Sequence, residues 1–303
     1  MDESKIHTPV LLAESIASLS LKEGDVVVDC TVNRGGHAEE IAKIIGKKGK
    51  LIIFDLDKNA LEYSEKRLKA IKDGPQVIAI HSNYRNIKEK LSENNITQVD
   101  KIFADLGLSS QELETSGRGF SFMRDEPLLM SFDSDSASDE NILTAKDLLK
   151  NLNAKQLEDI FKNYGDETRG KKIAEKIVET IKAGGEINTT KELVDIIISV
   201  TGHKPWQKSH PATKIFQALR IAVNDEYDSI KDMIKSSMEI LKTGGVLSII
   251  SFHSGEDRIV KNTFNEIKKA ETGKLFQKQK PKEEEIRANR RSRSALLRTV
   301  EKL

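Results

Sequence analysis

The chain has 303 residues, which is enough to bury a sizeable core, and two domains are a reasonable expectation. Charged residues make up 32% of it, no apolar run approaches the roughly 18 residues of a membrane span, and the first residues lack a signal-peptide pattern. We therefore expect a cytoplasmic protein with no membrane attachment. The single cysteine, Cys30, excludes an internal disulfide framework, and no Cys/His cluster has zinc-site spacing, so we expect no metal.

The net charge of +1 hides an asymmetry along the chain. Residues 268–303 contain twelve Lys or Arg against five Glu, a balance of +7, so the rest of the chain sums to −6. One interpretation of such a basic end is a solvated tail. The other is contact with phosphate, because Arg and Lys neutralise a nucleic-acid backbone without reading its sequence.

A strand, a tight turn and a helix start follow one another at residues 26–41, VVVDCTVNRGGHAEEI. Three valines lead to Asp29, and the paired glycines Gly35 and Gly36 come just before a segment with helical spacing that begins at His37. α/β proteins use this arrangement to hold a nucleotide-like ligand at a helix N-terminus. The plainer interpretation is a turn without a ligand, with His37 as an ordinary polar residue.

Short apolar runs alternate with helical stretches through the first hundred residues. The spacing predicts buried strands at DVVVDC (25–30), KLIIFDLD (50–57), QVIAIHSN (76–83) and DKIFADLG (100–107). The segments between these runs carry helical periodicity. Strands that alternate with helices form parallel crossover units, so we expect a doubly wound, mostly parallel sheet and the α/β fold class.

The pattern changes after about residue 110. Three amphipathic stretches follow one another with no strand between them, at 144–165, 169–184 and 189–202. We expect an inserted all-helical domain at 112–210, with residues 1–111 and 211–303 forming the α/β domain.

The α/β pattern returns after this insertion. We expect one long helix starting near His210, a turn at Gly244 and Gly245, and a strand at 246–252.

Polar residues at the expected strand ends narrow the choice of ligand. Asp55 follows the paired glycines by about 20 residues, where an acidic side chain accepts hydrogen bonds from ribose hydroxyls. The loop reads NRGGH and lacks the three glycines of a nicotinamide site, so an NAD oxidoreductase is not expected. Asp105 ends the fourth strand, where a reacting group would lie. Together these features favour a methyl donor, although NAD and S-adenosylmethionine use the same ribose contact.

Longer stretches resemble one family closely. They are DLGLSS (105–110), RGFSFMRDEPL (118–128), HPATKIFQALRIAVNDE (210–226) and SFHSGEDRIVK (251–261), within a likeness that runs from HTPVLLAES at His7 to RSRSALLR ending at Arg298. In this order they identify the chain as similar to the ribosomal RNA small subunit methyltransferase H family, also called the MraW family. The resemblance implies a Rossmann-like methyltransferase domain with an inserted helical domain.

The resemblance also implies an activity: methyl transfer from S-adenosylmethionine to the exocyclic N4 of one cytidine in the decoding region of small-subunit (16S) rRNA. The implied partner is this rRNA or the ribosomal subunit, and the oligomeric state, including a homodimer, stays open. By motif, the implied donor-binding residues are Gly35, Gly36, His37, Asp55, Tyr84 and Asp105. We further expect Asp105 and the SFHSGED segment to meet at the accepting nitrogen, with His253 or Asp257 helping to receive its proton.

Several positions depart from the family pattern. Asn33 replaces a third glycine and can still adopt a left-handed conformation. Glu112 replaces a donor-site glutamine, Leu129 and Ser131 replace an acid and an arginine, and Gly255 stands where leucine is usual. We expect these changes to fall on loops near the active site.

Two other functions stay open beside the leading one. A diverged copy of the enzyme would be a non-catalytic RNA-binding or assembly factor that kept the fold and the basic end. A third reading is an amino-methyltransferase with a different target. In each case the helical insertion and the basic C-terminus are the expected RNA-contacting surfaces, and Trp206 is a candidate for stacking on a base.

Overall fold

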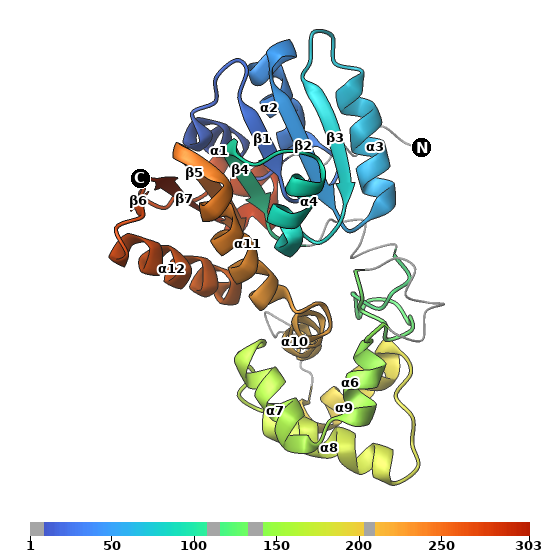
Figure 1. Cartoon of the computed structure of the whole chain (residues 1–303). Coiled ribbons are helices and arrows are strands. Elements are labelled where there is room, and N and C mark those ends of the chain that lie inside the picture. The colour runs from blue at the N-terminus through green and yellow to red at the C-terminus, as the bar shows by residue number, and fades with distance from the viewer. Residues whose placement is uncertain (1–8, 108–115, 133–141, 203–209) are drawn as a thin grey trace. The chain divides into compact units, whose positions relative to one another are not determined.

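The computed structural model describes residues 9–107, 116–132, 142–202 and 210–303 (Figure 1). The chain divides into two compact units, one of residues 1–107 with 227–303 and one of residues 108–226. The insertion predicted at 112–210 is shorter than the second unit, and its boundaries stay a prediction. No helix in the described ranges is long and apolar enough to cross a membrane.

The first unit is built on a seven-stranded sheet in the order β3-β2-β1-β4-β5-β7-β6. The first five strands pair in parallel, while β7 is antiparallel to both β5 and β6. The predicted doubly wound, mostly parallel sheet is therefore confirmed. The strands are β1 (Val26–Asp29), β2 (Lys50–Asp55), β3 (Gln76–His81), β4 (Val99–Asp105), β5 (Leu241–Ser251), β6 (Gly273–Leu275) and β7 (Leu296–Lys302).

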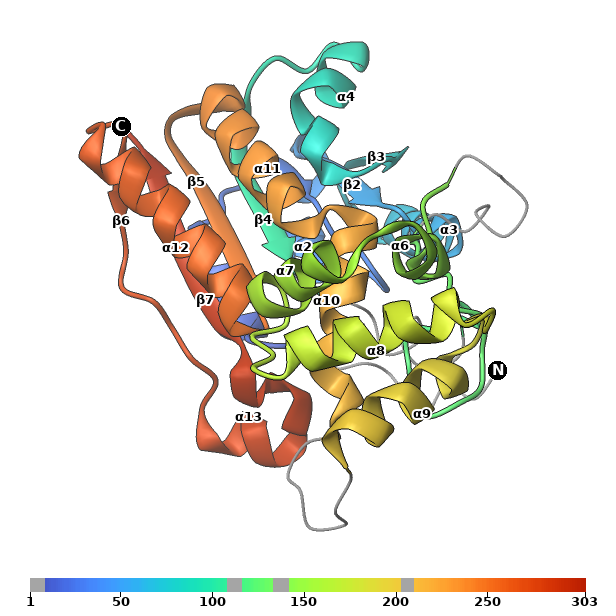
Figure 2. The same cartoon turned by 90° about the horizontal axis from the view of Figure 1, so that it is seen from below.

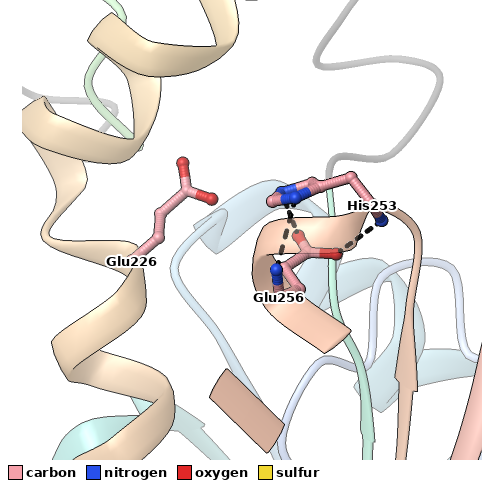
Figure 3. A group of neighbouring side chains, drawn as sticks. All are labelled: Glu226, His253 and Glu256. Carbon is pink, nitrogen blue, oxygen red and sulfur yellow. Dashed lines mark hydrogen bonds and ion pairs between the residues drawn. The ribbon is translucent and has the colours of Figure 1, made fainter. Parts of the chain in front are cut away.

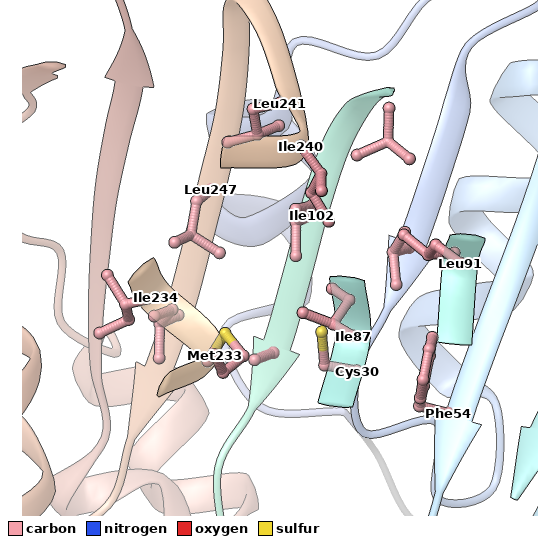
Figure 4. Close-up of a cluster of buried hydrophobic side chains, with 14 of the residues drawn as sticks. Cys30, Phe54, Ile87, Leu91, Ile102, Met233, Ile234, Ile240, Leu241 and Leu247 are labelled. Carbon is pink, nitrogen blue, oxygen red and sulfur yellow. The ribbon is translucent and has the colours of Figure 1, made fainter. Parts of the chain in front are cut away.

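Helices cover both faces of this sheet, and alternate strand residues point to each face. Val28, Ile52 and Ile102 pack with α4, α11 and α12, in the cluster that Figure 4 draws. Val27 and Phe103 pack on the other face with α1, α2 and α3. The helices of this unit are α1 (Leu12–Leu19), α2 (Gly36–Ile45), α3 (Lys58–Lys69), α4 (Ile87–Glu93), α11 (Glu226–Ile240), α12 (Ser254–Lys269) and α13 (Glu283–Ala288), with the 3-10 turns η1 (Gly46–Lys48), η2 (Tyr84–Asn86) and η4 (Arg290–Ser294).

The predicted strands match β1 to β4 within two residues at each end, but β5 begins earlier than expected. Val99 pairs with Leu241, and only two residues later Lys101 pairs with Val246. The predicted turn at Gly244 is thus an irregularity inside β5, where Gly244 has a φ of 76°. Extra residues in one strand of a ladder bulge out, which glycine tolerates.

The basic C-terminus is not a solvated tail. Its strand β7 lies inside the sheet between β5 and β6, and Val300 and Leu297 are buried. The tail interpretation was wrong for β7, where the basic residues Arg298 and Lys302 stand among residues that face the core. Figure 2 shows this segment in red, from α12 through α13 to β7.

The second unit is helical in its regular structure, and one cluster of buried residues, including Phe161, Ile177 and Leu219, joins its helices. Its last helix does not continue into α11 as one long helix, contrary to the prediction. Asp225 takes a φ of 48°, and this left-handed residue ends α10. The helices are α6 (Ala145–Asn151), α7 (Ala154–Asn163), α8 (Gly170–Lys182), α9 (Thr190–Thr201) and α10 (Ala212–Asn224).

Candidate active site

The strand order of the first unit reverses between β1 and β4. The chain adds β2 and β3 on one side of β1 and then returns to place β4 on the other side. In open α/β sheets, ligands bind in the crevice outside the carboxyl ends of the strands at such a reversal. The loop after β1, residues 30–35, and Asp105 at the end of β4 lie at this point; we call residues 30–35 the first loop.

The first loop is held by hydrogen bonds to the next strand and helix. The Asn33 N–H donates to Asp55 Oδ2 at 2.8 Å, and the Ser64 hydroxyl of α3 donates to the Asn33 carbonyl at 2.7 Å. Asn33 has a φ of 48°, so it adopts the left-handed conformation expected where the family usually has glycine. The loop therefore keeps its turn despite this substitution, because Asn is among the residues that tolerate left-handed backbone.

The paired glycines allow the segment before α1 to pack closely against the start of α2. Gly35 has a φ of 77°, and a Cβ atom on Gly36 would lie 2.3 Å from Pro9 Cγ. The N-terminus of α2 thus packs directly on the segment before α1. Its first backbone N–H groups have no partner earlier in the helix, as at any helix start.

His37 is buried in the first turn of α2. Its Nε2 lies 3.0 Å from the Val10 carbonyl oxygen, its Nδ1 lies 3.8 Å from Asp105 Oδ2, and its ring packs on Phe103 with 4.6 Å between centroids. The Val10 contact is best made by a protonated Nε2, which leaves Nδ1 facing the carboxylate region. His37 therefore links the N-terminal segment to the end of β4.

Asp55 and Tyr84 stand at the ends of the next two strands along the sheet. Asp55 accepts backbone N–H groups on both oxygens, from Asn33 and from Asp57 at 2.9 Å. Tyr84 begins η2 after β3 and packs partly buried against the core. Each Asp55 oxygen has a second lone pair, so it can also accept a ligand hydroxyl.

Asp105 is tied to the first loop across the strand reversal. Its N–H donates to the Thr31 hydroxyl oxygen at 2.6 Å. The side chain is 14% exposed, and its Oδ1 is shielded from solvent with no hydrogen-bond partner among the described residues. A buried carboxylate oxygen in this condition costs free energy unless a ligand supplies a donor.

The carboxyl groups at this edge raise one another's pKa. Burial raises the pKa of Asp105 well above its ordinary value, and the nearby Asp29 and Glu256 carboxylates raise it further. Burial and, to a smaller extent, Asp55 raise the pKa of Asp29 to about 7, although the Thr31 N–H opposes this shift by donating to Asp29 Oδ1. Burial also raises the pKa of the Cys30 thiol, which makes it an inert core residue.

His253 and Glu256 form a capping box at the start of α12, in which each side chain bonds the backbone of the other residue (Figure 3). The His253 Nδ1 accepts the Glu256 N–H at 3.3 Å, and Nε2 lies 3.0 Å from Glu256 Oε1. Glu256 Oε2 in turn accepts the Phe252 N–H at 2.7 Å. Through the bond to its Nδ1, His253 holds the start of the helix in place, while its Nε2 is shielded from solvent and makes no hydrogen bond among the described residues. Glu226, also drawn in Figure 3, belongs to the second unit, where it pairs with Arg220 at 2.7 Å.

Asp257 is engaged in a different contact from the one expected. Both of its oxygens accept from Arg298 of β7, at 2.6 Å from Nε and 3.0 Å from Nη2. This two-pronged ion pair fastens α12 to the sheet. Asp257 therefore has a structural task, and we leave it out of the proton acceptors proposed below.

Gly255 leaves room for a tyrosine. It is buried, and a Cβ atom there would lie 1.7 Å from the Tyr227 hydroxyl oxygen. Leucine, the usual residue of the family, cannot occupy this position while Tyr227 keeps its place. The departure at residue 255 thus compensates for the neighbouring aromatic ring.

The other departures belong to the second unit or lie outside the described residues. Ser131 is buried, and its carbonyl accepts from Arg118 at 3.2 Å, while the Leu129 carbonyl accepts the Ala145 N–H at 2.9 Å. Both belong to the second unit. Glu112 and Trp206 lie outside the described residues.

Sequence reasoning missed Thr31 and Glu256 as parts of this edge. Thr31 supplies the oxygen that binds the Asp105 N–H, and Glu256 is 1% exposed beside His253. A usable signal was present for each. A hydroxyl residue two positions after the end of β1 falls at the strand reversal, and a glutamate three positions after a polar residue indicates a capping box.

Replacement of Asp29 by asparagine tests the electrostatics of this edge. The folded protein holds the Asp29 proton up to about pH 7, whereas an unfolded chain releases it near pH 4. The stability of the wild type therefore falls as the pH rises from about 4 to 7, and Asp29→Asn lacks this loss. We expect the free energy of unfolding of the variant, minus that of the wild type, to grow across this window by on the order of 4 kcal/mol at most.

Urea denaturation at several pH values measures this difference. Replacement of the exposed Asp73 by asparagine is the matched control for the loss of one carboxylate. A pH-independent difference for Asp29→Asn would contradict the raised pKa.

Comparison with known proteins shows the family of the chain. The chain matches the MraW methylase family over residues 4–303. It is 42% identical to the ribosomal RNA small subunit methyltransferase H of Clostridium botulinum (strain 657 / Type Ba4), with 98% of this chain and 99% of that protein covered. The proteins of the same name from Dictyoglomus thermophilum and Mycoplasmopsis synoviae are 41% and 40% identical, each over 98% of this chain and 97% and 98% of their own lengths.

The family match covers both the first loop and the C-terminal strand that packs beside β5. It therefore includes every residue that builds the edge of the sheet described above. On this match, the chain belongs to the MraW methylase family.

Proposed function

We propose that this protein transfers a methyl group from S-adenosylmethionine to the exocyclic N4 of one cytidine in the decoding region of small-subunit rRNA. Family membership supports the methylase activity, and the names of the relatives support small-subunit rRNA as the substrate. The choice of a cytidine N4 rests on the motif resemblance. The observation that carries the proposal is the buried, unsatisfied Oδ1 of Asp105 at the strand reversal.

The edge of the sheet suits a positively charged donor. When bound, S-adenosylmethionine supplies a methyl group on a cationic sulfur, and it also carries an ammonium group. The Asp29 and Glu256 carboxylates are close enough to Asp105 to raise its pKa. A cation bound among the three carboxylates therefore relieves their mutual repulsion. Gly35 and Gly36 bring the backbone close to such a ligand, and Asp55 is suited to accept its ribose hydroxyls.

Asp105 is the proton acceptor that we propose. The lone pair of the cytosine amino group is delocalised into the ring, so the nitrogen becomes a better nucleophile as its N–H bond is polarised. Asp105 Oδ1 is available to accept this N–H. As the bond from nitrogen to the methyl carbon forms, the sulfur–methyl bond would break with its electron pair left on sulfur, the donor would leave as a neutral thioether, and the amino proton would pass to Asp105. The same environment that raises the pKa of Asp105 makes its carboxylate a stronger base, and a neighbouring cation favours the ionised form before the reaction.

The remaining predicted residues take supporting roles. His37 orients Asp105 from the start of α2, and Tyr84 is proposed to lie against the adenine of the donor. His253 is proposed to position the α12 turn through Glu256, rather than to accept the proton. The target cytidine has to be unpaired or extruded, because a base edge inside a helix cannot reach a donor held at the edge of a sheet.

Mapping of the methylated nucleotide tests the proposal. Purified protein is incubated with labelled S-adenosylmethionine and small ribosomal subunits, or their rRNA, that lack the modification. We expect N4-methylcytidine at one position of the decoding region, identified by nucleoside mass spectrometry. Label in another nucleotide would indicate a changed target, and donor binding without any label in rRNA would indicate a non-catalytic RNA-binding factor.

Replacement of Asp105 by asparagine tests the proton acceptor. The side chain keeps its size but loses its charge and its basicity, so we expect the rate of methyl transfer at saturating donor to fall at least about 100-fold, in addition to the weaker donor binding that loss of this carboxylate causes. Single-turnover assays and calorimetry measure the two quantities separately. Asp257→Asn is the matched control, and it should keep its rate within a few-fold because that carboxylate serves Arg298. Equal losses in the two variants would refute the assignment.

A further inference from the structure

Four exposed arginines stand together where the chain enters β7. Arg287 lies near the end of α13, and Arg290, Arg291 and Arg293 belong to η4. We call these four residues the arginine ridge. The acidic residues of this segment, Glu283, Glu284 and Glu285, all lie in the first turn of α13, where Glu283 pairs with Arg287 at 3.6 Å. The other three arginines follow in η4, which contains no acidic residue.

The ridge has a fixed backbone that turns its arginines outward. Ser292 is fully buried, its hydroxyl donates to the Asn289 carbonyl at 2.8 Å, and the Asn289 side chain accepts the Arg291 N–H at 3.2 Å. Ala295, just after η4, is buried in the core cluster of α1 and α2. The buried serine anchors the turn, and the residues on either side of it are left at the surface.

Two hydrogen bonds connect the first turn of α13, through Leu11 and Val10, to His37 in the first turn of α2. Glu285 Oε1 accepts the Leu11 N–H at 2.8 Å, and the neighbouring Val10 carbonyl binds His37 Nε2 at 3.0 Å. Leu11 has a φ of 53°, a conformation that leucine adopts only when its surroundings impose it. Glu285 is one of these surroundings. The start of α13, which directly precedes the ridge, is thus held against the segment that packs on the start of α2.

We propose that the arginine ridge binds the phosphate backbone of the substrate RNA next to the site of methyl transfer. This inference rests on the proposed function, because it assigns the ridge to the same rRNA substrate. Arginine is the residue best suited to this task, since its planar fork matches the oxygens of a phosphate. Phosphate contacts of this kind set the register of an RNA without reading its sequence, so the ridge positions the strand and the pocket selects the base.

The test measures RNA affinity as a function of salt for the full-length protein. The probe is an unmethylated decoding-region fragment of small-subunit rRNA, followed by fluorescence anisotropy. Arg290→Ala combined with Arg293→Ala removes two contacts. At about 0.7 counterions released per contact, this variant should bind about 25-fold more weakly at 0.1 M salt, and the slope of log K against log salt should fall by about 1.4.

Two further variants distinguish a specific contribution of the ridge to RNA binding from the effect of the net positive charge of the protein. Lys268→Ala with Lys269→Ala removes the same charge from the last turn of α12, next to β6, whose Gly273 pairs with the far end of β7 at Lys302. It should keep its RNA affinity within about twofold. Arg290→Lys with Arg293→Lys keeps the charge and should preserve most of the salt slope. All variants should bind S-adenosylmethionine as the wild type does.

The outcomes distinguish failure of the ridge from failure of the proposed function. A wild type that binds and methylates the RNA, beside an Arg290 and Arg293 double variant of unchanged affinity, overturns the ridge alone. The ridge assignment is also overturned if Lys268→Ala with Lys269→Ala weakens RNA binding as much as Arg290→Ala with Arg293→Ala does. RNA binding would then reflect general charge attraction. A wild type that neither binds nor methylates the RNA overturns both proposals.

Discussion

The hydrogen bond from the Asp105 N–H to the Thr31 hydroxyl fixes the distance between the two strand ends at which the sheet changes direction. β1 and β4 are neighbours in space but are separated by two complete crossover units in the chain. The ladder between β1 and β4 ends where Asp29 pairs with Phe103, and this hydrogen bond joins the loop after β1 to the end of β4 just beyond it. Asn33, His37 and Asp55 then build outward from it, each through one hydrogen bond or close contact with its neighbour.

The same edge carries an electrostatic cost that the fold does not itself relieve. Asp29 and Asp105 are buried carboxyl groups with raised pKa values, and no buried cation of the described first unit stands between them. The repulsion between these carboxyl groups lowers the stability of the protein without ligand. A ligand that relieves this repulsion gains the same free energy as binding affinity. A cationic donor accounts for why these acids are gathered there.

Local sequence signals predicted the first four strands, but they did not predict the last two strands or the contacts between distant parts of the chain. The alternation of apolar runs and helical spacing gave β1 to β4, because each buried strand of a parallel sheet is a continuous apolar run. It did not reveal β6 and β7, whose apolar residues are interleaved with lysines and arginines. The partners of Asp257 and Leu11 lie 41 and 274 residues away along the chain, so no spacing rule reaches them. The polar residues of the site could be predicted from their positions at strand ends. The separate roles proposed for Asp105, His253 and Asp257 could be assigned only from the contacts that their side chains make in the structure.

Binding of S-adenosylmethionine by isothermal titration calorimetry tests the central claim, that this edge of the sheet is a donor site. The account predicts one molecule bound per chain and no detectable binding to Asp55→Ala, which loses both the ribose acceptor and the anchor of the Asn33 N–H. Asp57→Ala is the control, since Asp57 caps α3 two residues away and should leave the affinity within a few-fold. Equal binding by the wild type and Asp55→Ala, or no binding by a folded wild type, would contradict the account.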